Sequence, residues 1–81
     1  MAIRVLFFAT LADITGSHET ALDPAGLSDV SSVFSAFVCR FPALETHWKS
    51  TLSAVNSEFA GPDTPVHDGD EVAFFPPVSG G

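Results

Sequence analysis

The chain has few cations, one cysteine and no tyrosine. Its 81 residues carry three Lys and Arg together against ten Asp and Glu, a formal net charge of −7. The cations Arg4, Arg40 and Lys49 are scattered, so no basic stripe can neutralise phosphates, and we expect no nucleic-acid binding. The negative charge would complement a protein partner with a basic surface. An alternative of equal weight is that the acidic residues serve only solubility.

The single cysteine, Cys39, excludes an intrachain disulfide and a cysteine-based metal cluster. We expect it to fill the core near the edge of an apolar helix face, because no His or Asp is placed by the sequence to activate it. The histidines lack metal-ligand spacing, and the acidic group at 68–71 is interpreted as a solvated turn, so we expect no metal.

Long hydrophobic runs are also missing. No apolar segment approaches the roughly 20 residues of a membrane span, and the N-terminus has no signal-peptide pattern. We therefore expect a cytoplasmic protein without a membrane partner.

What the chain does contain is apolar residues in regular patterns. Hydrophobic residues make up 46%, with eight Phe, which is enough for one small core. Residues 3–9 predict a first strand, with Phe8 on its outer face, and residues 19–22 a weak second strand after a turn at 15–17.

One apolar stripe at helical spacing follows: Val30, Val33, Phe34, Phe37, Val38 and Phe41. Ser28 or Asp29 can cap this helix, and Pro42 ends it.

The second half predicts a short helical turn at 43–49 and strands at 52–57 and 71–75. One main helix and one small sheet require that the helix cover one sheet face. The first and last strands are the most apolar, which suits the centre of the sheet. The fold class is therefore α+β: a β-grasp (ubiquitin-like) roll with a mixed sheet, spanning residues 1–75.

We expect residues 76–81 to form an extended tail, which consists of Pro76, Pro77, Val78, Ser79, Gly80 and Gly81. The prolines favour a polyproline II shape, and the last four residues reach at most about 13–14 Å. The two glycines have no Cβ, so this tail can enter a narrow channel and leave its terminal carbonyl uncrowded. Adenylation would make that carbonyl an acyl phosphate anhydride open to a sulfur nucleophile. The product is a thiocarboxylate, and hydrolysis after sulfur delivery restores the carboxylate.

Residues 68–81 (DGDEVAFFPPVSGG) resemble the C-terminal signature of the small subunits of molybdopterin synthase. Residues 3–9 (IRVLFFA) are similar to the first strand of that family, and Ala54, Val55 and Asn56 to its characteristic strand. The segment around Thr46, His47 and Trp48 does not align with the family pattern.

The resemblance implies that Gly81 is adenylated by an enzyme related to ubiquitin-activating enzymes and receives sulfur from a sulfurtransferase. Gly81, at the end of the Gly80 tail, would then deliver sulfur to cyclic pyranopterin monophosphate, and two loaded carriers would build each dithiolene. The tail would insert into the large subunit of a heterotetramer. The chain itself would be a non-catalytic sulfur donor that binds no cofactor, with ATP used by the activating enzyme.

A docking surface is predicted where the tail begins. Phe8 and Phe75 lie on the outer faces of strands expected to be neighbours, and Phe59 can join them. The family's docking patch falls at these positions, and Pro76, Pro77, Val78 and Ser79 would bind the partner with the tail. The alternative is that the chain covers its own outer sheet face.

Other functions share the glycine chemistry. One is a sulfur carrier for another pathway, such as thiazole synthesis or tRNA thiolation, and another is a ubiquitin-like modifier that forms isopeptide bonds to lysines. A third alternative, a plain binding module with an idle tail, does not use that chemistry. The run from Phe74 to Val78 favours the molybdopterin pathway.

Overall fold

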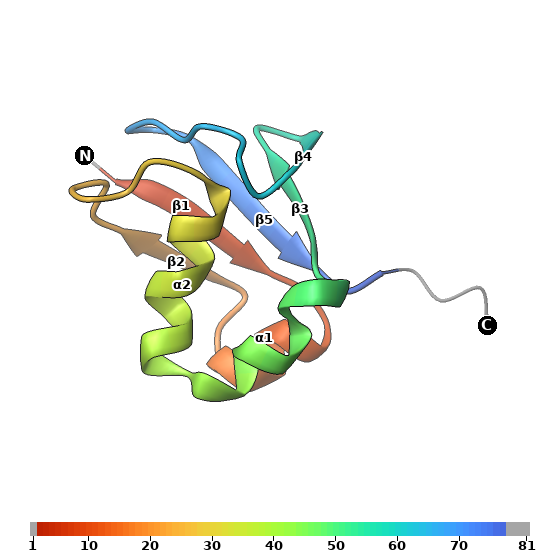
Figure 1. Cartoon of the computed structure of the whole chain (residues 1–81). Helices are drawn as coiled ribbons and strands as arrows, with labels where there is room; N and C mark the ends of the chain where they lie inside the picture. The colour runs from red at the N-terminus through yellow and green to blue at the C-terminus, as the bar shows by residue number, and fades with distance from the viewer. Residues whose placement is uncertain (1, 78–81) are drawn as a thin grey trace.

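The computed structural model describes residues 2–77, which fold into a five-stranded mixed sheet with its helices on one side (Figure 1). The elements in chain order are β1 (Ile3–Phe7), α1 (Thr10–Thr15), β2 (Glu19–Leu22), α2 (Val30–Arg40), the 3₁₀ segment η1 (Pro42–Ser50), β3 (Leu52–Val55), β4 (Glu58–Ala60) and β5 (Glu71–Phe75). Residues 78–81, which include the predicted carrier glycines, lie outside the described part of the chain.

The strand order is β2-β1-β5-β3-β4, and the central pair β1 and β5 runs parallel. β2 is antiparallel to β1, and β3 is antiparallel to both β5 and β4. The two most apolar strands therefore occupy the middle, where both of their edges are paired. This arrangement confirms the predicted β-grasp roll.

The core lies between the sheet and α2. The inner sheet face contributes Ile3, Val5 and Phe7 from β1, all fully buried, because alternate strand residues point to the same side. The ring of Phe7 meets Phe37 of α2 edge to face with centroids 5.0 Å apart. Burying each such side chain stabilises the fold by about 1.5–3 kcal/mol relative to its exposure. The predicted helical stripe is thus the face that α2 turns to the sheet.

Helix α2 begins with a reciprocal capping box. The Asp29 carboxylate accepts a hydrogen bond from the Ser32 N–H at 2.9 Å, and the Ser32 hydroxyl oxygen accepts one from the Asp29 N–H at 3.1 Å. The loop before β5 satisfies two more N–H groups, because the Thr64 and Pro62 carbonyls accept from Val30 and Ser31. Of the two predicted caps, Asp29 is the one used.

The predicted first strand ends at Phe7 and not at Ala9, and three further elements depart from the sequence expectation. The connection between β1 and β2 contains α1 rather than only a turn, and Gly16 ends this helix with a left-handed φ of 74°. The strand predicted at 52–57 stops at Val55, because Asn56 and Ser57 take positive φ and turn the chain into β4. Phe59 therefore lies in β4, a strand that the sequence did not predict.

The expectation for Cys39 was wrong, because its side chain is exposed. The apolar stripe of α2 reaches Val38, which is partly buried against the core, and the next residue already faces away from the sheet. Trp48 of η1 fills the place beside α2 instead, stacking on Phe34 at a centroid distance of 4.6 Å.

Among residues 2–77, no helix is both long enough and apolar enough to cross a membrane. The same residues contain no cluster of three His, Cys, Asp or Glu side chains placed to hold a metal ion.

Candidate functional site

Three phenylalanine rings meet on the outer face of the sheet. Phe75, half-buried at the end of β5, lies between the other two rings, with centroids 6.4 Å from Phe8 and 6.0 Å from Phe59. Phe59 is 82% exposed and Phe8 47%. We call these three residues the aromatic patch. An exposed aromatic cluster of this kind is typical of a protein-binding surface.

The strand register explains why these rings meet. In the parallel pair, Leu6 lies opposite Ala73, and the Phe8 N–H continues the ladder by donating to the Phe74 carbonyl at 3.2 Å. Phe8 and Phe75 therefore extend from neighbouring strands on the same side. Phe59 pairs with Ala54 in β3, and that pair lies on the same face of the sheet.

Leu52 is a further apolar residue beside the aromatic patch. It is the register partner of Phe75, shares the outer face with Ala54 and is 39% exposed. Sequence reasoning placed the strand but did not single out this residue. The alternation within β3 carries the signal, because Leu52 and Ala54 are two positions apart.

The turn after Phe8 is strained. Ala9 has φ 52° and ψ −127°, the geometry of the first central residue of a type II′ turn, where glycine is preferred. The Leu11 N–H closes this turn by donating to the Phe8 carbonyl at 3.1 Å. The turn directs the chain from β1 into α1 and leaves the Phe8 ring on the outer face.

A shallow apolar groove leads from the aromatic patch to the start of the tail. Its lining residues are Phe8, Ala9, Ala73, Phe75, Pro76 and Pro77. The predicted contact residues Pro76 and Pro77 thus lie against the same surface as the rings. Val78, Ser79, Gly80 and Gly81 were predicted to continue this site and lie outside the described residues.

No helix within residues 2–77 covers this outer face, because α1, α2 and η1 all lie on the other side of the sheet (Figure 1). The exposure of Phe8 and Phe59 agrees with this arrangement. The alternative that the folded domain covers its own outer face is therefore wrong for the described residues.

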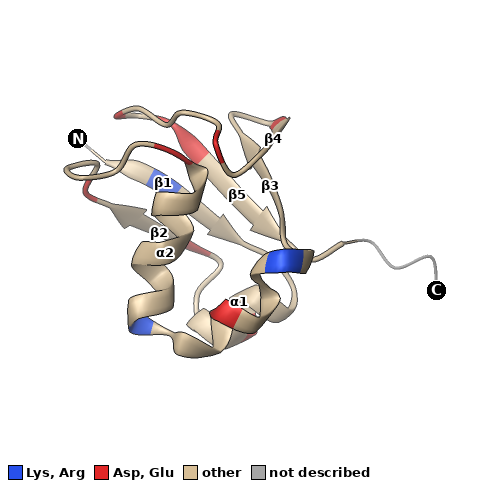
Figure 2. Cartoon of the chain, viewed as in Figure 1, with Lys and Arg blue, Asp and Glu red and all other residues tan. Residues whose placement is uncertain are grey.

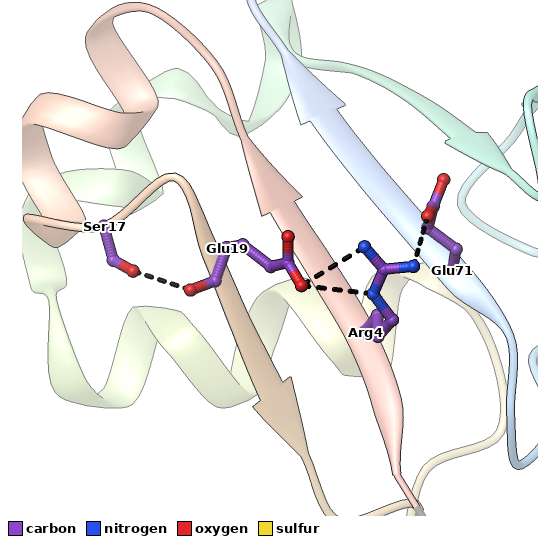
Figure 3. Close-up of polar contacts among 4 residues, drawn as sticks. All are labelled: Arg4, Ser17, Glu19 and Glu71. Carbon is purple, nitrogen blue, oxygen red and sulfur yellow. Dashed lines mark hydrogen bonds and ion pairs between the residues drawn. The ribbon is translucent and has the colours of Figure 1, made fainter.

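The far end of the same face is polar. The Arg4 guanidinium contacts the Glu19 carboxylate at 3.2 Å and the Glu71 carboxylate at 3.0 Å, and Ser17 donates to the Glu19 carbonyl (Figure 3). These are exposed pairs that stabilise the fold only slightly. Figure 2 shows the Lys and Arg residues on separate elements, with acidic residues distributed around them.

Comparison with known proteins shows which family the chain belongs to. Residues 5–81 match the model of the ThiS family. The chain belongs to the ThiS family. The chain is 41% identical to the molybdopterin synthase sulfur carrier subunit of Escherichia coli, with 98% of this chain and 99% of that protein covered. The predicted resemblance to these sulfur carrier subunits is therefore confirmed.

Solved structures show that this ThiS-family chain has the ubiquitin-like β-grasp fold. The crystal structure of small archaeal modifier protein 1 (SAMP1) from Haloferax volcanii superposes with a TM-score of 0.84 at 32% identity, over 100% of both chains. A complex of subunits 1 and 2 of molybdopterin-converting factor from Helicobacter pylori matches with a TM-score of 0.67 at 23% identity, again over 100% of both chains. The second likeness concerns the fold alone.

Proposed function

We propose that this chain is the sulfur carrier subunit of a molybdopterin synthase, with Gly81 as the residue that holds the sulfur. The observation that carries the proposal is the place of the aromatic patch: Phe75 packs between Phe8 and Phe59, and the tail starts at the next residue. A partner that binds the patch is thereby placed to receive the tail. Full-length similarity to sulfur carrier subunits supports the same function.

The proposed chemistry takes place at the Gly81 carboxylate. Attack of the carboxylate on the α-phosphate of ATP forms an acyl adenylate and releases pyrophosphate. Sulfur at the oxidation level of sulfide then displaces AMP and forms the thiocarboxylate. When that sulfur is passed to cyclic pyranopterin monophosphate, water supplies the oxygen that regenerates the carboxylate. Two such deliveries complete one dithiolene.

The proposed partner in sulfur delivery is the large synthase subunit. It would bind the aromatic patch together with Pro76 and Pro77 and enclose residues 78–81. Aromatic side chains in the centre of an interface commonly carry much of its binding energy. The catalytic side chains would belong to the large subunit, because this chain supplies only a reagent and a docking surface. The full assembly would be a heterotetramer with two carriers.

Loading requires two further partners in the cytoplasm. An adenylating enzyme related to ubiquitin-activating enzymes would bind ATP and activate Gly81, and a sulfurtransferase would supply the sulfur. The formal charge of −7 would speed encounter with a partner of basic surface.

A second candidate function is protein modification. The chain is 35% identical to small archaeal modifier protein 1 of Haloferax volcanii, over 91% of this chain and 94% of that protein. A modifier uses the same Gly81 adenylate, and a lysine amine then attacks it in place of sulfur. The two functions therefore differ in the nucleophile and not in the carrier.

Intact-mass spectrometry tests the proposal. The untagged chain is incubated with its activating enzyme, ATP and sulfide as the sulfur donor, and the expected product has one terminal oxygen replaced by sulfur. The matched control omits ATP and should remain a carboxylate. Repeated absence of the sulfur-containing species would contradict the carrier function, and branched peptides joining Gly81 to lysines would establish the modifier.

A further inference from the structure

The tip of the β3–β4 hairpin lies beside the start of β5. Asn56 and Ser57 are the two residues between the paired positions Val55 and Glu58, with φ of 52° and 72°. Two positive φ values are required by a type I′ turn, and Asn is favoured there. β4 is an edge strand that pairs with β3. β3 is held in the sheet by its pairing with β5, whereas β4 pairs with β3 alone, so the place of β4 depends also on the contacts at the hairpin tip.

Asn56 makes two hydrogen bonds to the backbone of Glu71. Its N–H donates to the Glu71 carbonyl at 2.8 Å, and its side-chain Oδ1 accepts from the Glu71 N–H at 3.0 Å. The amide oxygen takes the place that a backbone carbonyl holds in a regular antiparallel pair. The ladder between β3 and β5 is thus extended by one position beyond Val55 and Val72.

The other end of the same amide reaches the turn before β5. Asn56 Nδ2 donates to Asp70 Oδ1 at 3.0 Å, and Asp70 Oδ2 accepts from the His67 N–H at 2.7 Å. The Asp70 side chain is 18% exposed, so these bonds are partly shielded from water. One side chain therefore ties the hairpin tip to β5 and to the 67–70 turn.

These contacts bear on the aromatic patch because Phe59 follows Asn56 by three residues on the same hairpin. The Phe59 ring is 82% exposed and lies 6.0 Å from the Phe75 ring. With so little of the ring buried, its position is set mainly by the backbone that carries it. That backbone is held at the hairpin base by β3, where Ser53 Oγ donates to the Ala60 carbonyl, and at the tip by Asn56.

We infer that Asn56 is a positioning residue for partner docking: its amide holds the tip of the β3–β4 hairpin against the start of β5 and so keeps Phe59 beside Phe75. The inference rests on the proposed function in one respect, that the aromatic patch binds the large subunit. Its structural part, the link between Asn56 and the two rings, is measurable in the free chain.

Three variants test the link. Asn56→Gly keeps access to positive φ and removes the amide. Asn56→Asp keeps an acceptor for the Glu71 N–H, loses the donor to Asp70 and puts two carboxylates together. The double variant Asn56→Asp with Asp70→Asn exchanges the groups: the carboxylate at position 56 accepts from Glu71 and from the amide at position 70, whose oxygen accepts from His67. This exchange keeps the net charge and every hydrogen bond.

Two readouts are taken on each full-length variant. The first is the nuclear Overhauser contact between the Phe59 and Phe75 rings in the free chain, and the second is the Kd for the isolated large subunit. We expect both single variants to lose the ring contact and to bind on the order of tenfold more weakly. We expect the double variant to recover the contact and the wild-type Kd.

The control for general destabilisation is Ser32→Ala, which breaks the capping box of α2 on the other side of the sheet. It should lower stability and leave the ring contact and the Kd unchanged. The positioning role would be overturned if the single Asn56 variants kept both the ring contact and the wild-type Kd. It would also be overturned if they lost the ring contact without binding more weakly, or if the double variant failed to recover both. If Phe75→Ala also binds normally, the proposed docking surface is wrong, and the ring contact alone still decides whether Asn56 holds Phe59.

Discussion

The two ends of the outer sheet face differ in whether their side chains are exposed or paired within the chain. At the tail end, Phe8, Phe59 and Phe75 contact one another and leave much of their surface exposed to water. At the other end, Arg4 is engaged by Glu19 and Glu71, and Asp70 by Asn56 and His67. One end is apolar surface available to a partner, and the other is a polar network satisfied within the chain.

This difference separates binding from stability on a single sheet. Exposed apolar area gains free energy only when something covers it. Exposed ion pairs and hydrogen bonds stabilise the fold slightly, and they add little to the free energy of binding a partner. We therefore expect changes at the tail end to alter partner binding, and changes at the polar end to alter stability or the geometry of the strands.

Removal of Gly81 should have the largest effect. The deletion moves the terminal carboxylate to Gly80, one residue short of its proposed place in the partners, and sulfur transfer should be abolished. The melting temperature should stay the same, because within residues 2–77 the last strand ends at Phe75. Sulfur transfer is measured by mass spectrometry and unfolding by circular dichroism. A melted domain after the deletion would show that the tail is structural.

Phe75→Ala and Phe74→Ala should give opposite results, although the residues are adjacent. Phe74 is fully buried, so its truncation should cost about 3–5 kcal/mol of unfolding free energy. Phe75 belongs to the aromatic patch, so its truncation should weaken binding of the large subunit by about 2 kcal/mol or more. Urea unfolding and calorimetric titration measure the two quantities. Unchanged affinity with a large loss of stability in Phe75→Ala would place this ring in the core.

Ala9→Gly should raise stability. The substitution relieves a strain of about 1–3 kcal/mol at positive φ, and the added freedom of the unfolded chain cancels about 0.4–1 kcal/mol of that gain. The net effect should be a higher urea midpoint, and a lower midpoint would contradict the strain. The Kd for the large subunit is a second readout, because Ala9 lines the groove beside Phe8. Weaker binding in this variant would mean that the strained turn sets the Phe8 position.

Acid should act first at the polar end, where it weakens the hydrogen bond from Asn56 to Asp70. The hydrogen bond from the Asn56 side chain, followed by that from the His67 N–H, lowers the pKa of Asp70 below its ordinary value. A carboxylate with a lowered pKa stabilises the fold fully above its unfolded pKa, near 4, and loses this contribution as the pH falls through the folded pKa. NMR titration should show the Asn56 side-chain amide shifting only below about pH 4. A midpoint above that of free Asp would contradict the hydrogen-bond network.

Arg4→Ala should have the smallest effect. Both of its ion pairs are exposed, so the loss should be about 1 kcal/mol or less and should diminish as salt is added. Urea unfolding at low and high ionic strength measures it. Binding of the large subunit should not change, and a large loss of affinity would extend the docking surface to this end of the sheet.

The parts of the fold with a strong period were predictable from the sequence. Residues 3–9 and 71–75 are apolar runs, and the Val30 to Phe41 stripe repeats at helical spacing. The central strands and α2 were therefore correctly placed, although β1 ends two residues before the predicted boundary. The aromatic patch followed from strand alternation and the expected pairing of the first and last strands.

The missed elements are short and lack local signals. Helix α1 has six residues and no side-chain cap, and it follows a turn that normally needs glycine where this chain has Ala9. β4 has three residues and comes after Asn56-Ser57 instead of the stronger Asn-Gly signal. Asn56 itself acts through contacts 14 and 15 residues away, which no local pattern reveals.

A single-turnover experiment tests the carrier function most directly. The chain with its thiocarboxylate is mixed with the large subunit and cyclic pyranopterin monophosphate, and the mass of the chain is followed together with the appearance of the dithiolene. The account predicts that the Gly81 thiocarboxylate is converted back to a carboxylate as the dithiolene forms, with two carriers consumed per product. Dithiolene formation while the chain keeps its sulfur, or with the Gly81 deletion in its place, would contradict it.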